Sequence, residues 1–207
     1  MKALVTCFHP FRGRANNGSQ ALAHFLENRL PNTDLRVIEM PVQWGAVEAI
    51  ACPAIDEWSP DLLLGIGEGG PDAVVIETVG HNVRRGEDVD GTPPPSETIL
   101  ESGEEERRSR FSFAWDSRTA LAVPIHLGLD AGAYLCNHCL YTTCVWAAGQ
   151  QDAALAGFVH LLPATGSSDA SPGMPIERSI EVVGWLLDSV ATHIAALTPG
   201  PQREEQA

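Results

Sequence analysis

Short apolar runs alternate with longer amphipathic stretches in the first third of the chain, and this alternation constrains the fold more than any other feature. The apolar runs have the length of buried strands, and the stretches between them repeat their apolar residues with helical spacing. A strand-helix-strand-helix-strand order predicts a largely parallel sheet covered by helices. The expected strands are residues 3–8, 35–42 and 62–66, and the expected helices are residues 19–30 and 43–58.

The rest of the chain continues this pattern after one interruption. Residues 84–110 are highly charged and contain three consecutive prolines, so they suit an exposed excursion better than a core element. Residues 157–163 are expected to form a strand and residues 175–197 a long amphipathic helix. We therefore expect one α/β domain over residues 1–198, with a twisted, mostly parallel sheet sandwiched by helices, and a disordered tail over 199–207.

The composition excludes several classes of protein. With 207 residues, 44% of them apolar, the chain suits one domain of ordinary size. Its formal net charge of −14 argues against nucleic acid as a partner, because phosphate backbones are bound by clustered Lys and Arg. No apolar run has the length that spans a bilayer, and the N-terminus lacks a secretory apolar region, so we expect a cytoplasmic protein without a membrane partner.

Two cysteines, Cys136 and Cys139, are separated by only two residues. Such a pair can be half of a zinc site, a redox couple, or a nucleophile beside a bystander. Zinc would need a second pair of ligands, and the chain has no second C-x-x-C and no H-x-x-x-H. A thioredoxin-like couple would be expected near an early strand-helix-strand unit. Composition alone favours a fourth interpretation, in which Cys136, Cys139 and Cys144 are small apolar residues of a helix.

The position of Cys136 favours the nucleophile. AYLC has the pattern of a strand end, and NHCLYTTCVWAA has the pattern of the helix that follows. Cys136 would then lie at a helix N-terminus, where the helix dipole and the free N–H groups stabilise a thiolate. A nucleophilic thiol also needs a base, and His160 is one candidate among seven histidines.

Four motifs, in order, resemble those of one peptidase family. TCFHPFRG, followed by NGS, places Phe8 and Phe11 at paired aromatic positions. In VVIETVGHN, Glu77 precedes Asn82 by five residues. DAGAYLCNHCLY resembles the nucleophile motif, and GFVHLLP resembles the motif of the catalytic histidine. Over residues 3–197 the chain resembles pyroglutamyl peptidase I, also called pyrrolidone-carboxylate peptidase.

This resemblance implies a phosphorylase/hydrolase-like α/β fold and a cysteine peptidase that removes N-terminal pyroglutamate from peptides. Cys136 would be the nucleophile, His160 would accept and return a proton, and Glu77 would orient the imidazole. The substrate would be a peptide with a blocked N-terminus. No cofactor and no metal ion are implied, and family members are often homo-oligomers.

The resemblance also implies a substrate slot. Phe8 and Phe11 would sandwich the flat, uncharged lactam, and Tyr134 would add a third wall. Gly69 and Gly70 belong to the glycine-rich loop that follows the third strand in the family. The order of these glycines does not match the fingerprint of a dinucleotide-binding loop, so no nucleotide is expected.

The chain departs from the family in two places. Its loop has Pro71 where the family has Arg, and Gly67 or Glu68 where the family has Gln. A carboxylate pointing into the slot would attract a free α-ammonium group, so the orientation of Glu68 bears on the substrate. The family's Arg beyond the Asn has no clear match, although Arg84 and Arg85 are near and could hold an oxyanion. These departures leave open a thiol amidohydrolase with another substrate, or a catalytically silent binding protein.

Overall fold

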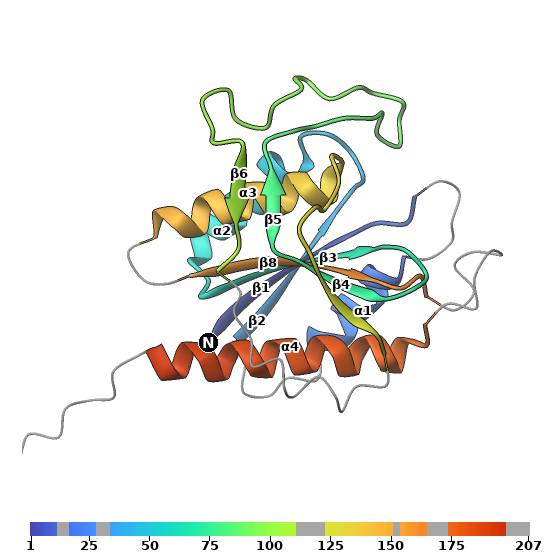
Figure 1. Cartoon of the computed structure of the whole chain (residues 1–207), viewed down its shortest axis with the longest axis vertical. Helices are drawn as coiled ribbons and strands as arrows, with labels where there is room; N and C mark the ends of the chain where they lie inside the picture. The colour runs from blue at the N-terminus through green and yellow to red at the C-terminus, as the bar shows by residue number, and fades with distance from the viewer. Residues whose placement is uncertain (12–16, 28–33, 111–122, 151–153, 165–173, 198–207) are drawn as a thin grey trace, which may run out of the picture.

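Six strands form one central sheet (Figure 1). The structure, a computed structural model, describes residues 1–11, 17–27, 34–110, 123–150, 154–164 and 174–197. The strands of this sheet are β1 (Lys2–Phe8), β2 (Asp34–Met40), β3 (Leu62–Glu68), β4 (Val74–Glu77), β7 (Ile125–Gly128) and β8 (Leu155–Leu161). Their order is β2-β1-β3-β8-β4-β7. Only the β4–β8 pair is antiparallel within the described sheet, so the sheet is mostly parallel, as predicted.

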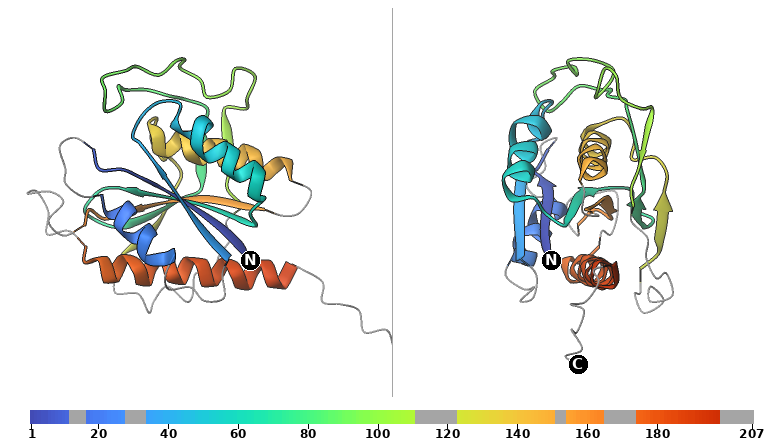
Figure 2. Two further views of the ribbon diagram at one scale, coloured as in Figure 1. Left: turned by 180° about the vertical axis from the view of Figure 1, so that it is seen from behind. Right: turned by 90° about the vertical axis from the view of Figure 1, so that its left-hand side faces the viewer.

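Helices cover both faces of the sheet (Figure 2). The helices are α1 (Gly18–Glu27), η1 (Val47–Ala51), α2 (Cys52–Trp58), α3 (Leu135–Gly149) and α4 (Ile176–Leu197). The first and the last of these pack together on one face, and the others lie on the opposite face. Among the described residues, no helix has the length and apolarity that a membrane span needs.

Side chains alternate between the two faces along each strand, and this places Glu77 and His160 on the same face of the sheet. On β8, Val159 packs in the core against α1 and α4, whereas Phe158 packs in the core beside α3. His160 therefore projects to the α3 side. By the same alternation Ile76 lies in the α1–α4 core, and Glu77 projects to the α3 side. Each fully buried apolar side chain of this kind stabilises the fold by about 1.5–3 kcal/mol.

The predicted helix over residues 43–58 is wrong in its first part. Residues 43–45 form a turn, and a one-turn π-helix, η1, precedes α2 and runs directly into it. The N–H of Cys52 donates to the carbonyl of Val47, which is the wider spacing of a π-helix. Pro53 follows at once, so the irregular turn accommodates a proline that an unbroken α-helix would hold in its interior.

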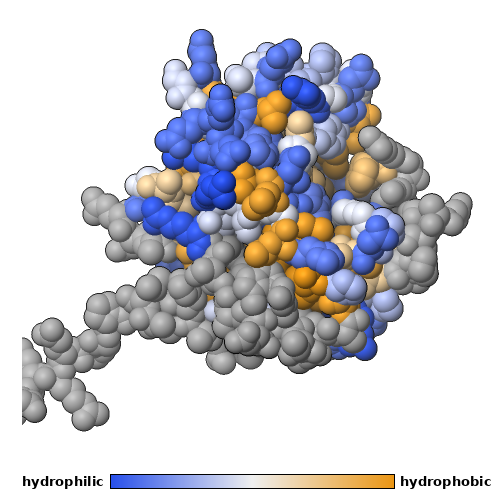
Figure 3. Space-filling model, in the orientation of Figure 1, coloured by the Kyte–Doolittle hydropathy of each residue, from blue (hydrophilic) through white to orange (hydrophobic). Residues whose placement is uncertain are grey.

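Residues 84–105, called the excursion below, run over the outside of α3 (Figure 1). The surface in this part of the molecule is largely hydrophilic (Figure 3). The prediction of an exposed segment is therefore correct over most of its length. Residues 106–108 are mostly exposed too, but they form strand β6 (Glu106–Arg108), which was not predicted and pairs antiparallel with β5 (Val79–His81) in a second, two-stranded sheet. The prediction of exposure is wrong for Arg84, which is buried.

The remaining predictions of elements agree with the structure where the chain is described. The strand predicted over 157–163 is β8, and the helix predicted over 175–197 is α4. The end of the first predicted helix, residues 28–30, and the predicted tail, residues 199–207, lie outside the described residues.

Candidate active site

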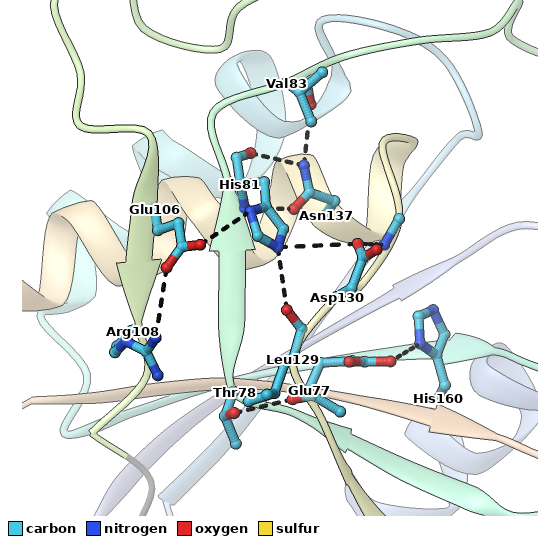
Figure 4. Close-up of polar contacts among 12 residues, drawn as sticks. Glu77, Thr78, His81, Val83, Glu106, Arg108, Leu129, Asp130, Asn137 and His160 are labelled. Carbon is cyan, nitrogen blue, oxygen red and sulfur yellow. Dashed lines mark hydrogen bonds and ion pairs between the residues drawn. The ribbon is translucent and has the colours of Figure 1, made fainter.

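A histidine and a glutamate on neighbouring strands form the centre of the candidate site (Figure 4). Strands β4 and β8 are antiparallel, and Glu77 lies opposite Phe158, two residues from His160. The Nδ1 atom of His160 lies 2.9 Å from Oε1 of Glu77, within hydrogen-bonding distance. The His160 side chain is 15% exposed and that of Glu77 is 5% exposed, so solvent weakens this pair little. Glu77 therefore fixes the orientation of the imidazole ring.

A third group, the thiol of Cys136, lies close enough to the same imidazole to raise its pKa. Cys136 is the second residue of α3, after Leu135. The first-turn N–H groups of a helix lack intrahelical acceptors, so they can donate to an anion formed at this thiol or at a bound carbonyl oxygen. The predicted strand end at AYLC is wrong, because β7 ends at Gly128 and a loop leads into the helix. The predicted position of Cys136 at a helix N-terminus is nevertheless correct.

The protonation of His160 follows from its two partners. Burial alone would lower its pKa, because a charged imidazole loses solvation. Interaction with Cys136 and with Glu77 outweighs burial and raises the pKa of His160 to about 10. The imidazole is therefore held as a cation at neutral pH and can supply a proton.

Two glycines of strand β3 and the following loop make room for Cys136 and His160. A Cβ atom at Gly67 would lie 3.1 Å from the sulfur of Cys136, and a Cβ at Gly69 would lie 2.7 Å from Cβ of His160. Gly69 was predicted to contact substrate, and the structure places it against His160. Gly70, predicted with it, is exposed. The alternation G-x-G-x-G, which leaves one strand face without side chains, is the sequence signal that could have identified Gly67.

A third glycine, Gly128 on β7, accommodates the carboxylate of Glu77. Strand β7 pairs with β4 so that Gly128 lies opposite Glu77. A Cβ atom at Gly128 would overlap Oε2 of Glu77. This oxygen is buried and has no hydrogen-bond partner among the described residues. The glycine therefore sets how deeply the carboxylate lies between the strands.

Asn137, next to Cys136, anchors the start of α3. Its side-chain oxygen accepts a hydrogen bond of 2.7 Å from the N–H of His81, and its amide nitrogen donates to the carbonyls of His81 and Val83 at 2.8 and 3.0 Å (Figure 4). Asn137 is fully buried. These bonds hold the first turn of α3 against β5 and fix the position of Cys136.

The predicted slot residues lie in the core cluster that contains Cys136. Phe8 is buried in this cluster, and Phe11 and Tyr134 pack against it while partly exposed. Trp44 joins them, with its ring edge-on to Tyr134 at 5.3 Å between ring centroids. Trp44 was not predicted as a site residue, because it lies in a turn whose apolar spacing resembles that of a helix.

The neighbouring cysteines occupy the core. Cys139 is 1% exposed, with its sulfur 3.4 Å from the hydroxyl of Thr6. Burial raises the pKa of Cys139 to about 12 and that of Cys144 to about 12. All five cysteines are free thiols, and the described residues hold no group of three or more potential metal ligands. Cys136 is therefore the member of the C-x-x-C pair that is placed for chemistry.

Two positions at which the sequence departs from the family are also placed by the structure. The carboxylate of Glu68 faces the start of α1, where the N–H of Gly18 donates to it at 3.5 Å. Arg84, suggested as an oxyanion donor, lies 3.5 Å from Glu48 and donates to the carbonyl of Thr98 at 2.7 Å. Its guanidinium therefore holds the excursion.

A cavity of about 650 Å³ lies beside this constellation, between β5, the excursion and residues 130–133. His81, Arg85 and Asp130 are among its lining residues, whereas Cys136 and His160 are not. The position of the reactive groups, and not the size of this cavity, therefore identifies the candidate active site.

Comparison with known proteins supports the same interpretation. The family model for pyroglutamyl peptidase matches residues 1–192. The chain belongs to the pyroglutamyl peptidase family. A pyrrolidone-carboxylate peptidase of Staphylococcus haemolyticus is 30% identical over 166 residues, which is 78% of each chain. One of Treponema denticola is 26% identical over 202 residues, which is 92% of this chain and 93% of the relative.

Solved structures of this family share the fold. A mutant form of the pyrrolidone carboxyl peptidase of Pyrococcus furiosus has a TM-score of 0.82 and 23% identity, and the match covers 94% of this chain and all of that one. The pyroglutamyl peptidase I of Bacillus amyloliquefaciens has a TM-score of 0.83 and 21% identity, covering 93% and 96%. The predicted family and the predicted α/β architecture are thus confirmed.

Proposed function

We propose that this member of the pyroglutamyl peptidase family removes an N-terminal pyroglutamyl residue from peptides, with Cys136 as nucleophile. The observation that carries the proposal is the hydrogen bond from His160 to Glu77, with the thiol of Cys136, at the start of a helix, beside the same imidazole. Amide hydrolysis through a thioester needs these three roles: a thiolate, a proton carrier and a group that orients the carrier.

In the first step the Cys136 thiolate attacks the carbonyl carbon that joins the pyroglutamyl group to the next residue. The developing oxyanion is stabilised by N–H groups of the first turn of α3. As the C–N bond breaks, the His160 imidazolium donates its proton to the leaving amine. A thioester on Cys136 and a free peptide result.

In the second step neutral His160 accepts a proton from a water molecule, which attacks the thioester carbonyl. The C–S bond breaks, pyroglutamate is released, and the proton returns Cys136 and His160 to their starting ion pair. Glu77 accepts the hydrogen bond of the ring and stabilises the imidazolium throughout.

The slot explains the preference for a lactam. Phe8, Phe11 and Tyr134 offer apolar surface to an uncharged ring, whereas a free α-ammonium group would lose solvation there. Glu68 would be the natural counter-ion for an ammonium, but its carboxylate faces the start of α1. The helix N-terminus favours a negative charge at this place, so Glu68 is held away from that role.

The test compares a pyroglutamyl fluorogenic amide with the matching free-amine glutaminyl amide, in the wild-type enzyme and in Glu68→Gln. We expect the wild type to favour the pyroglutamyl amide by at least about 100-fold in kcat/KM, since the ammonium finds no counter-ion. Glu68→Gln should keep this preference. Equal or better turnover of the free amine by the wild type would instead assign the chain to a thiol amidohydrolase with another substrate, and turnover of neither would indicate a binding protein.

Four further properties stay predictions. We propose a single catalytic domain over residues 1–198, a cytoplasmic location, assembly into a homo-oligomer and no binding of nucleic acid. Size-exclusion chromatography with light scattering measures the assembly state directly.

A further inference from the structure

Two segments far apart in the chain are joined beside Tyr134. Residues 42–44, which follow β2, lie against residues 86–90 of the excursion. The N–H of Val89 donates to the carbonyl of Val42 at 3.1 Å, and the N–H of Trp44 donates to Oδ2 of Asp88 at 3.1 Å. The side chains of Gln43 and Asp90 form a further hydrogen bond. The excursion is therefore attached to the turn that carries Trp44.

Two aromatic side chains complete this attachment. The indole N–H of Trp44 donates to the carbonyl of Gly86 at 3.1 Å, and the hydroxyl of Tyr134 donates to the carbonyl of Glu87 at 3.1 Å. The two rings meet edge-on, with centroids 5.3 Å apart. Two consecutive carbonyls of the excursion thus hold the polar ends of both rings, while the rings support each other.

The backbone of the excursion is shaped for this contact. Gly86 has a φ of +89°, a conformation that side chains disfavour. A Cβ atom there would lie 3.7 Å from the Tyr134 ring, so the backbone runs close over the ring.

A cluster of polar side chains around the half-exposed carboxylate of Glu48 joins the same parts a second time. Nε2 of His138, two residues after Cys136, lies 2.9 Å from Oε1 of Glu48, and Nη1 of Arg84 lies 3.5 Å from the same oxygen. His138 is fully buried, and its nearness lowers the pKa of Glu48, the carboxylate of the π-helix. The ring of Trp44 lies over His138, with centroids 6.0 Å apart. The first turn of α3, the π-helix and the excursion are therefore one connected unit.

We propose that Trp44 is a positioning residue for lactam recognition, which sets the place of the Tyr134 ring by bracing it against the excursion. The proposal rests on the proposed function, because Tyr134 is taken as a wall of the lactam slot. Trp44 acts through Tyr134, so its loss weakens binding of the lactam more than it slows the chemistry at Cys136. His160 and Glu77 form none of the hydrogen bonds that join Trp44 and Tyr134 to the excursion.

The chain offers a matched control in Trp146. It packs against the same core cluster, is also partly exposed, and donates its indole N–H to Oδ1 of Asp56 at 3.0 Å. This hydrogen bond reaches α2 and not the excursion. Trp44→Phe and Trp146→Phe therefore each remove one indole N–H. In Trp44 this group bonds to the excursion, and in Trp146 it bonds to α2.

The experiment measures KM and kcat for the pyroglutamyl amide, and the binding of 2-pyrrolidone by its protection of Cys136 from iodoacetamide. Trp44→Ala should raise KM and weaken 2-pyrrolidone binding about tenfold, because a hydrogen bond and a ring contact are lost together. Trp44→Phe and Tyr134→Phe should each give about a threefold change, since each keeps an aromatic ring at its position and loses one hydrogen bond. In all three variants kcat should stay within about twofold, and Trp146→Phe should match the wild type.

Hydrogen exchange of the excursion gives a readout that does not depend on activity. Amides of residues 86–90 should exchange faster in Trp44→Ala and Trp44→Phe than in Trp146→Phe. Equal exchange and equal 2-pyrrolidone binding in the Trp44 and Trp146 variants would overturn the proposal while leaving the peptidase function intact. A wild type that neither binds 2-pyrrolidone nor cleaves the pyroglutamyl amide would overturn the function first, and the role of Trp44 with it.

Discussion

His160 and Glu77 are held by paired strands, whereas Trp44 and Tyr134 are held by loops that polar contacts join. Backbone pairing of β4 with β8 and β7 fixes the first pair, and alternation along the strands points both side chains to one face. The aromatic pair depends on carbonyls of the excursion, which has little regular structure. The difference indicates that the groups proposed for the chemical step lie on rigid elements. The groups proposed for binding the lactam depend on loops, whose sequence can change without disrupting the sheet.

Replacing Cys136 should have the largest effect of any substitution. Cys136→Ala and Cys136→Ser remove the thiolate, and kcat/KM should fall by about 10⁴-fold or more. Cys139→Ser is the matched control in the same helix, and its kcat/KM should stay within about threefold of the wild type, because Cys139 is a core residue. Steady-state assays of the purified variants measure both. A comparable loss in Cys139→Ser would restore the hypothesis of a paired-cysteine site.

Glu77→Gln should have the next largest effect. An amide cannot stabilise the imidazolium, and it can hold the ring with the wrong nitrogen protonated, so kcat should fall by about 10²–10⁴-fold. KM should change little, because the carboxylate is buried away from the slot. A rise in KM at constant kcat would contradict the assignment of Glu77 to the chemical step, because it would show that Glu77 takes part in substrate binding.

Gly128→Ala tests how sharply the strands position that carboxylate. The added methyl group would overlap Glu77 Oε2 and push the carboxylate away from His160. We expect kcat to fall by about 10–100-fold, the size of effect that small displacements of catalytic groups produce. Gly184→Ala in α4 is the control, because its methyl group would meet nothing within 4 Å, and it should leave kcat unchanged while slightly stabilising the helix. Equal activity of the two variants would show that β7 does not position Glu77.

The pH dependence of stability gives a smaller effect with a definite sign. The pKa of His160 is raised from 6.5 to about 10 in the folded chain, although burial opposes the shift, because the partners Cys136 and Glu77 hold the cation. Its contribution to the free energy of unfolding is therefore fully present below pH 6.5 and is lost as the pH rises towards about 10. Urea unfolding should show a steeper loss of stability over this range in the wild type than in His160→Gln. Parallel curves would mean that the imidazole is not held as a cation.

The same contrast between regular strands and irregular loops explains which elements could be predicted from the sequence. Strands β1, β3 and β8 are buried on both faces, so they appear in the sequence as continuous apolar runs, and their prediction was correct. The π-helix η1 and the turn before it were missed, because their apolar spacing resembles that of an ordinary helix and only Pro53 marks the change. Strand β6 was missed because a short, charged edge strand has no apolar pattern.

The residues of the candidate site also differ in how well the sequence predicted them. Cys136 and His160 were predicted because local motifs mark them, and the structure brings them together. The fit between Glu77 and Gly128 could not be predicted, since it depends on the register of β4 against β7, two strands that are distant in the chain. Trp44 was missed because its partners, Gly86 and Tyr134, are distant in sequence and no periodicity connects them.

The most direct test of the account is to trap the acyl-enzyme. The wild-type enzyme is mixed with a pyroglutamyl ester, quenched with acid during turnover, digested and analysed by mass spectrometry. The account predicts one pyroglutamyl group, carried as a thioester on Cys136, and none in Cys136→Ala. A pyroglutamyl group on another residue, or hydrolysis of the ester by Cys136→Ala at the wild-type rate, would contradict it.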